Sequence, residues 1–146
     1  MAESLAVIII IAALSAFVLP KYRKMWETQK TNEADAVLHI VRLEQELRCV
    51  MGKPYATLEQ LSALVPSLST KNFTYTQGAD GKSLIATSNG AYTYQLKMLS
   101  YRDGRICCTG QDCSKLNKNY LQCGNITAVQ APECQATPVT LTEAGS

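Results

Sequence analysis

The chain has 146 residues and a formal net charge of +2, with 14 Lys and Arg residues against 12 Asp and Glu residues. This length suits one domain rather than two. The near balance of charge, without a basic stripe interleaved with aromatic residues, argues against a nucleic-acid partner. The charge is unevenly placed, because residues 4–20 carry none and the remainder reads as an ordinary soluble sequence.

An uncharged apolar segment opens the chain and extends from Ser4 to Pro20. As an α-helix, this segment would span about 26 Å, slightly less than the roughly 30 Å hydrocarbon core of a bilayer. Lys21, Arg23 and Lys24 follow at once, and their long side chains can reach the lipid headgroups. The segment therefore predicts a short membrane-spanning helix, with membrane lipid as its surroundings.

Three interpretations of this segment compete. A removable signal peptide lacks support, because no basic region precedes the apolar run and no small-residue cleavage site follows it. A plain membrane anchor explains the run but not Glu3. A carboxylate that enters lipid unpaired costs about 3 kcal/mol, so Glu3 either remains in interfacial water or meets a partner there. The third interpretation, an assembly subunit, depends on the residues around Pro20.

A helical pattern continues beyond Pro20 as an apolar stripe with a 3.6-residue period. Its members, with Val37 and Val41 beside them, are Ala36, Ile40, Leu43, Leu47 and Val50. Gly52 and Pro54 predict its end. We expect one helix of about fifty residues, ending near residue 52 and interrupted at Pro20, where a proline costs about 3 kcal/mol. The proline acts either as a kink or meltable point, or simply ends the spanning segment.

The remaining sequence predicts a short helix over residues 57–64, capped by Thr57, and then a small sheet. Strand-like runs cover residues 73–76, 84–87, 92–99 and 105–108, with Gly- and Asn-rich turns between them. Asn89 and Gly90 predict a tight hairpin turn. We expect an antiparallel sheet of three or four strands whose apolar face covers the stripe of Ile40, Leu43 and Leu47, followed by an irregular tail.

Six cysteines lie at Cys49, Cys107, Cys108, Cys113, Cys123 and Cys134. An even number in a short chain with a membrane-targeting segment predicts disulfides and an oxidising compartment. A zinc site is the alternative, but the sequence has no Cys-x-x-Cys pair and only one histidine, His39. Adjacent strand residues point to opposite faces, so Cys107 and Cys108 should have partners in different places. We predict the pairs Cys49–Cys107, Cys108–Cys113 and Cys123–Cys134, which would hold the tail in place.

Glu3, the apolar run and Pro20-Lys21-Tyr22 together resemble the N-terminus of type IV pilins and type II secretion pseudopilins. The spacing of 17 positions from Glu3 to Pro20 is that of the family. The resemblance is strong over residues 3–22, moderate to residue 52, and only architectural beyond. Its register places Met1 at the third mature position, so it implies a leader upstream that a leader peptidase and methylase would process.

The resemblance implies a pilin-like α+β fold, in which a long helix kinked near Pro20 packs on a small antiparallel sheet with a disulfide-rich tail. Residues 1–20 would be the transmembrane and filament-core half of the helix, residues 21–52 its soluble half, and residues 53–146 the globular domain. Glu3 and Pro20 would be the assembly residues, with Glu3 neutralising the terminal amine of a neighbouring subunit.

The implied function is that of a structural subunit of a type IV pilus or a type II secretion pseudopilus. The subunit would wait in the inner membrane, with its C-terminal domain outside the cytoplasm, and then polymerise into a cell-surface or periplasmic filament. Its partners would be itself or other pilin-like subunits, and an inner-membrane machine with a cytoplasmic ATPase. The basic cluster after Pro20 would by itself place the domain in the cytoplasm, but the six cysteines favour the oxidising side.

Enzymatic activity is not expected, because the sequence shows no nucleophile–base set and no Gly-rich phosphate loop. We also expect no cofactor and no metal, since Asp80, Asp103 and Asp112 are scattered rather than clustered. The alternative function is a membrane-tethered extracytoplasmic binding or sensor domain that does not polymerise.

Overall fold

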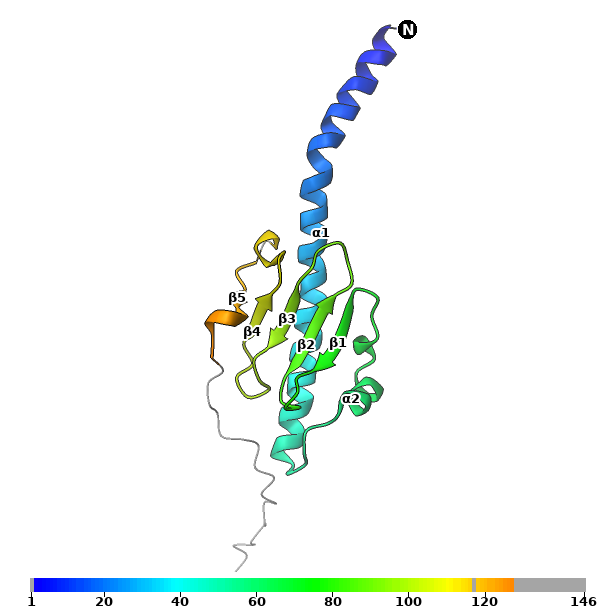
Figure 1. Cartoon of the computed structure of the whole chain (residues 1–146). Coiled ribbons are helices and arrows are strands. Elements are labelled where there is room, and N and C mark those ends of the chain that lie inside the picture. Colours follow the sequence, from blue (N-terminus) through cyan, green and yellow to red (C-terminus); the bar gives the residue numbers. More distant parts are fainter. Residues whose placement is uncertain (1, 117, 128–146) are drawn as a thin grey trace, which may run out of the picture.

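The computed structural model describes residues 2–116 and 118–127. One long helix, α1 (Ala2–Val50), lies across one face of a five-stranded sheet, and its N-terminal part projects well beyond that sheet (Figure 1). A short helix, α2 (Leu58–Leu64), connects α1 to the sheet. The strands are β1 (Phe73–Gln77), β2 (Leu84–Ser88), β3 (Gln95–Met98), β4 (Ile106–Thr109) and β5 (Leu121–Gln122). The α+β class predicted from the sequence is confirmed.

Helix α1 is continuous through Pro20, so the predicted interruption is wrong. A proline removes only the hydrogen bond that its own N–H would donate to the carbonyl four residues earlier, here that of Ala16. The helical bonds on either side are retained, and Ser15 adds one by donating its hydroxyl to the Ile11 carbonyl at 2.7 Å. Figure 1 shows α1 curving where it leaves the sheet rather than breaking.

The end of α1 near Gly52 and the start of α2 at Thr57, both predicted from the sequence, are present. Gly52 has φ of 72°, the left-handed conformation that ends helices, and its N–H donates to the Cys49 carbonyl at 3.0 Å. At the start of α2, the Thr57 hydroxyl accepts from the Gln60 N–H while the Gln60 side chain accepts from the Thr57 N–H. This reciprocal capping satisfies two backbone donors that the first helical turn leaves unpaired.

The sheet has the order β1-β2-β3-β4-β5, and its first four strands are antiparallel neighbours. The prediction of a purely antiparallel sheet is wrong at one edge, because β5 pairs with β4 in parallel. After β4 the chain passes through a short 3₁₀ turn, Cys113–Lys115, and returns to lie beside β4 in the same direction. A strand of two residues, Leu121–Gln122, leaves no alternation in the sequence to detect.

The β2–β3 connection is a loop over residues 89–94 and not the predicted tight turn at Asn89-Gly90. Asn89 is held against β1 instead, because its N–H donates to the Asn72 carbonyl at 3.0 Å. Its side chain oxygen also accepts from the Thr74 hydroxyl at 2.9 Å. These bonds keep the chain extended past β2 and carry the turn toward α1.

The core lies between the sheet and the face of α1 that carries Ala34, Val37, Leu38 and Val41. The predicted stripe is therefore wrong in phase, since Ile40, Leu43 and Leu47 are turned away from the sheet. The reason is that α1 has apolar residues on two faces. The buried face also carries polar Glu27, Thr31 and Gln45, which interrupt its apolar pattern in the sequence.

Candidate functional site

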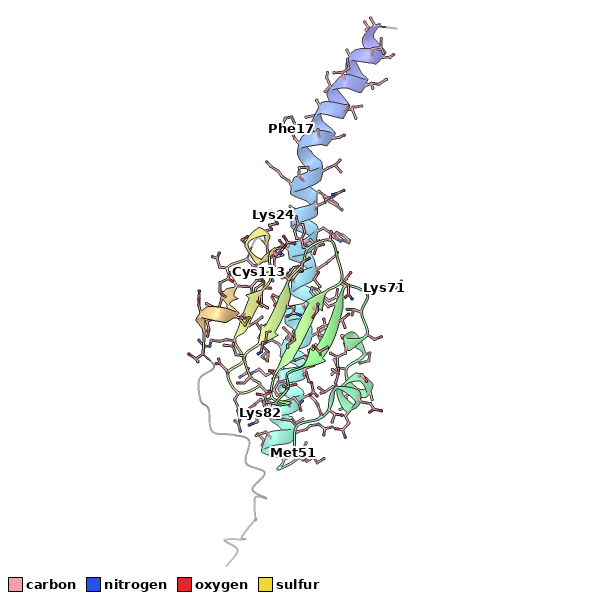
Figure 2. All side chains as sticks on the ribbon, in the orientation of Figure 1. Phe17, Lys24, Met51, Lys71, Lys82 and Cys113 are labelled. Carbon is pink, nitrogen blue, oxygen red and sulfur yellow. A yellow bond between two sulfur atoms is a disulfide. The ribbon has the colours of Figure 1, made fainter. Side chains whose placement is uncertain are left out.

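The N-terminal half of α1 exposes its apolar side chains on all sides. Leu5 is 63%, Ile9 67% and Phe17 76% exposed. Figure 2 shows this part of α1, including Phe17, extending without any neighbouring element. It is the one helix in the described chain that is long and apolar enough to cross a membrane. Contiguous apolar surface of this extent marks a membrane or protein contact.

A second apolar surface lies on the soluble half of α1, which we call the outer stripe. It consists of Ile40, Leu43, Leu47 and Val50, which are between 45% and 73% exposed. Their spacings of three, four and three residues place them along one line of the helix, as in the seam of a coiled coil. The outer stripe thus offers a surface suited to packing against another helix.

Contacts on the opposite face fix the direction of the outer stripe. Buried Gln45 accepts from the Ala56 N–H at 2.8 Å and donates to the Ala56 carbonyl at 3.0 Å. The Arg42 side chain donates to the Tyr101 carbonyl at 2.8 Å. Nearer the N-terminus, Asp35 accepts from Lys118 at 2.8 Å. With these bonds in place, α1 cannot rotate about its axis to bury the stripe against its own sheet.

The two predicted assembly residues lie on the projecting part of α1. Glu3 is exposed in the first turn, where a carboxylate interacts favourably with the positive end of the helix dipole. Within the described residues it has no ion-pair partner. Pro20 lies 17 positions further on, about 26 Å along the axis at 1.5 Å per residue. The structure therefore does not bring the two together within one chain.

The disulfides differ from the predicted set. The pair Cys108–Cys113 is confirmed. Cys107 pairs with Cys123 at a Cα–Cα distance of 5.0 Å, so the predicted pairs Cys49–Cys107 and Cys123–Cys134 are wrong. The parallel return of β5 explains this, because it places Cys123 beside β4. Cys49 is disulfide-bonded too; Cys134 lies outside the described residues.

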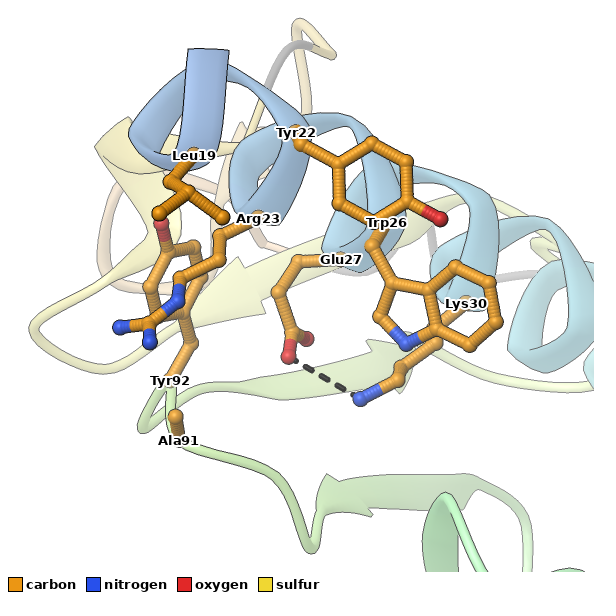
Figure 3. Close-up of a pocket in the computed structure, with 8 residues that line it drawn as sticks. All are labelled: Leu19, Tyr22, Arg23, Trp26, Glu27, Lys30, Ala91 and Tyr92. Atoms are coloured by element: carbon orange, nitrogen blue, oxygen red, sulfur yellow. Dashed lines mark hydrogen bonds and ion pairs between the residues drawn. The ribbon is translucent and has the colours of Figure 1, made fainter. Parts of the chain in front are cut away.

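A pocket lies where α1 leaves the sheet, and we call it the junction pocket (Figure 3). Its volume is about 600 Å³. It is lined by Leu19, Tyr22, Arg23, Trp26, Glu27 and Lys30 of α1, and by Ala91 and Tyr92 of the 89–94 loop. Sequence reasoning missed this site because it placed Tyr92 in a strand rather than in the loop. In residues 2–116 and 118–127, no three His, Cys, Asp or Glu side chains gather to hold a metal ion.

Charge in the junction pocket is partly paired. Glu27 is only 5% exposed and accepts from the Lys30 ammonium at 3.1 Å, which neutralises it. The loop approaches this pair closely, since a Cβ atom at Gly90 would lie 3.0 Å from a Glu27 oxygen. Burial and then the Glu27 charge raise the pKa of Tyr94, so its hydroxyl stays neutral. Arg23 forms no ion pair within the described part of the chain.

Comparison of the chain with protein-family models, curated proteins and solved structures gave no match. The geometry above is therefore the basis for assigning a function.

Proposed function

We propose that this protein is a membrane-anchored subunit that polymerises into a helical filament of the type IV pilus or secretion pseudopilus kind. The observation that carries the proposal is the outer stripe, which lies on the same helix as the exposed apolar N-terminal half of α1. Its own domain covers only the opposite face of the helix. A second copy of α1 supplies a matching apolar seam of the same spacing.

The energetic case rests on the exposed area. Ile40, Leu43, Leu47 and Val50 are half to three-quarters exposed. Because full burial of such a side chain contributes about 1.5–3 kcal/mol, covering the remaining surface of each contributes about 1–2 kcal/mol. The N-terminal half of α1 gains nothing comparable while it stays in lipid, which is as apolar as its side chains. The outer stripe therefore provides the gain that favours the filament over the free membrane subunit.

Glu3 and Pro20 have distinct roles in this proposal. In a bundle of apolar helices, Glu3 requires a cation, and the terminal amine of a neighbouring subunit supplies one. An unpaired carboxylate in such surroundings costs about 3 kcal/mol. At Pro20, α1 lacks one backbone hydrogen bond, which lowers the cost of bending as the helix leaves the membrane.

In the membrane, the subunit has a single span with its C-terminal domain on the oxidising side. Disulfides Cys107–Cys123 and Cys108–Cys113 support this side, because such bonds persist in oxidising compartments. An inner-membrane machine with a cytoplasmic ATPase extracts and stacks the subunits, and a leader peptidase and methylase process them.

The outer stripe is tested with two matched leucines, Leu47 in the stripe and Leu64 on α2, each 53% exposed. Leu47→Glu should abolish filaments, as electron microscopy of sheared surface material would show, while membrane levels of the subunit stay normal. Leu64→Glu is the control for an added surface charge and should leave filaments intact. Normal filaments from Leu47→Glu would refute the role of the stripe, and normal filaments from Glu3→Ala would refute the role of Glu3.

The second candidate function is a membrane-tethered binding or sensor domain, and the junction pocket is the observation that favours it. This function predicts a monomer in detergent at all concentrations and no effect of Leu47→Glu on activity.

A further inference from the structure

We propose that the junction pocket binds the phosphate of an anionic phospholipid headgroup, in the leaflet next to the soluble domain. The inference rests on the membrane placement in the proposed function but not on polymerisation. It gives the subunit a specific lipid contact before assembly.

The depth of the pocket matches the headgroup layer. The apolar run ends at Leu19, which lines the pocket, and Arg23 lies four residues later, about 6 Å further along the axis. The polar layer on each side of a bilayer is about 5–8 Å thick. The Arg23 guanidinium therefore reaches the level of the lipid phosphates when the apolar run fills the hydrocarbon core.

The charge of the pocket favours an anion. Lys30 neutralises Glu27 through their 3.1 Å ion pair, which leaves the positive charge of Arg23 uncompensated within the pocket. Arg23 is exposed, and Figure 3 shows its guanidinium directed toward Tyr92 and away from the Glu27–Lys30 pair. A guanidinium binds a phosphate with two parallel hydrogen bonds, a geometry that an ammonium cannot provide.

The pocket walls suit the part of the headgroup at the level of the phosphate and on its aqueous side. Tyr22 and Trp26 stack at 6.5 Å between ring centroids, and Tyr92 closes the pocket from the loop. Tyr92 is itself held by Lys115, whose ammonium lies 5.8 Å from the ring centroid. Aromatic side chains with one polar end are favoured at the membrane interface. A volume of about 600 Å³ is within the range of small-molecule sites and admits a glycerophosphate group.

Trp26 is the only tryptophan of the chain and lines the pocket, so its fluorescence reports occupancy. The full chain is reconstituted in phosphatidylcholine vesicles that contain brominated phosphatidylglycerol or, at equal bromine density, brominated phosphatidylcholine. Measurements at about 1 M salt, where the Debye length is near 3 Å, suppress diffuse attraction. We expect phosphatidylglycerol to be preferred around Trp26 by about fivefold, because the choline ammonium compensates the phosphate charge in phosphatidylcholine and nothing does so in phosphatidylglycerol. A direct hydrogen-bonded contact accounts for a preference of this size and is screened by salt much less than diffuse attraction.

The matched variants are Arg23→Gln and Lys24→Gln. Each removes one positive charge at almost the same depth, but Lys24 lines a hollow with Met25 and Thr28, apart from the junction pocket. Arg23→Gln should lose the preference for phosphatidylglycerol, whereas Lys24→Gln should retain it. Equal losses in the two variants, or no preference in the native chain, would overturn the proposal.

Two further results identify the cause of a failure. Inorganic phosphate should compete for Arg23 only when its concentration approaches that of headgroups at the bilayer surface. Complete loss of the preference at a far lower phosphate concentration would show that the pocket takes free phosphate, and would overturn the lipid assignment. An absence of quenching by either brominated lipid would show that α1 does not enter the bilayer, which refutes the membrane placement itself. Quenching without headgroup preference refutes the junction pocket site alone and leaves the filament proposal intact.

Discussion

Two leucines on opposite faces of α1 separate stability from assembly. Leu38 is fully buried against the sheet, and Leu43 is 67% exposed in the outer stripe. Leu38→Ala leaves a cavity in the core, so we expect a loss of about 2–5 kcal/mol in the free energy of unfolding. Leu43 has only a third of its surface covered, and full burial of a leucine contributes about 1.5–3 kcal/mol. Leu43→Ala should therefore cost less than about 1 kcal/mol.

The assay is urea denaturation of the full chain in detergent, followed by near-ultraviolet circular dichroism, with filament yield measured in parallel. Leu38→Ala should lower the denaturation midpoint, and any filament loss should follow the loss of folded subunit. Leu43→Ala should leave the midpoint nearly unchanged and still reduce filament yield. If the two leucines exchanged these results, so that Leu43→Ala gave the larger loss of stability, the assignment of the faces of α1 would be refuted.

Three further predictions concern the globular domain. Gly110 has φ of 122°, and a Cβ atom at this position would lie 2.8 Å from the Thr93 carbonyl oxygen. In a denaturant titration, Gly110→Ala should therefore lower the free energy of unfolding by about 1–3 kcal/mol. Gly124 has open space around it, so Gly124→Ala is the neutral control. Replacing Cys108 and Cys113 by Ala should cost about 2 kcal/mol in the chain-entropy account, and non-reducing peptide mapping of the native chain should recover that pair. Burial, aided by the Glu33 charge, raises the pKa of Tyr75 from 10.0 to about 12. The neutral Tyr75 hydroxyl therefore contributes fully to the stability of the fold below pH 10, and this contribution is lost as the pH rises to 12. Circular dichroism across that range should show the loss, and Tyr75→Phe should reduce it; an unchanged alkaline profile would contradict the assignment.

Features of the fold that depend on local sequence were predictable. The capping box of Thr57 and Gln60 and the helix end at Gly52 both satisfy backbone groups with neighbouring residues, so the sequence alone identifies them. The phase of α1 was not predictable in the same way. Its buried face includes Gln45, whose amide is satisfied only by Ala56 after the chain has folded back. Because the buried face of α1 contains this polar residue, the exposed face with the outer stripe has the more regular apolar pattern in the sequence.

The disulfides, too, were predictable where they depend on local sequence and not where they depend on distant contacts. Cys108–Cys113 closes a short local loop, and the alternation of a strand correctly separated the directions of Cys107 and Cys108. The partner of Cys107 depends on β5, a two-residue strand that exists through its pairing with β4. The junction pocket likewise depends on where the 89–94 loop meets α1, which the strand prediction for Tyr92 concealed. Glu3 and Pro20 were identified through the resemblance of their spacing to that of the pilin family, and their assembly roles stay predictions.

The polar contacts between α1 and its domain also have a mechanical consequence. Asp35, Arg42 and Gln45 are bonded to three separate segments of the domain over about 15 Å of helix axis. A pull on the N-terminus of α1 acts along this axis, so it loads all three contacts together in shear rather than one after another. Sliding the helix would require their simultaneous rupture. The globular domain is therefore built to follow its helix as one rigid body under tension.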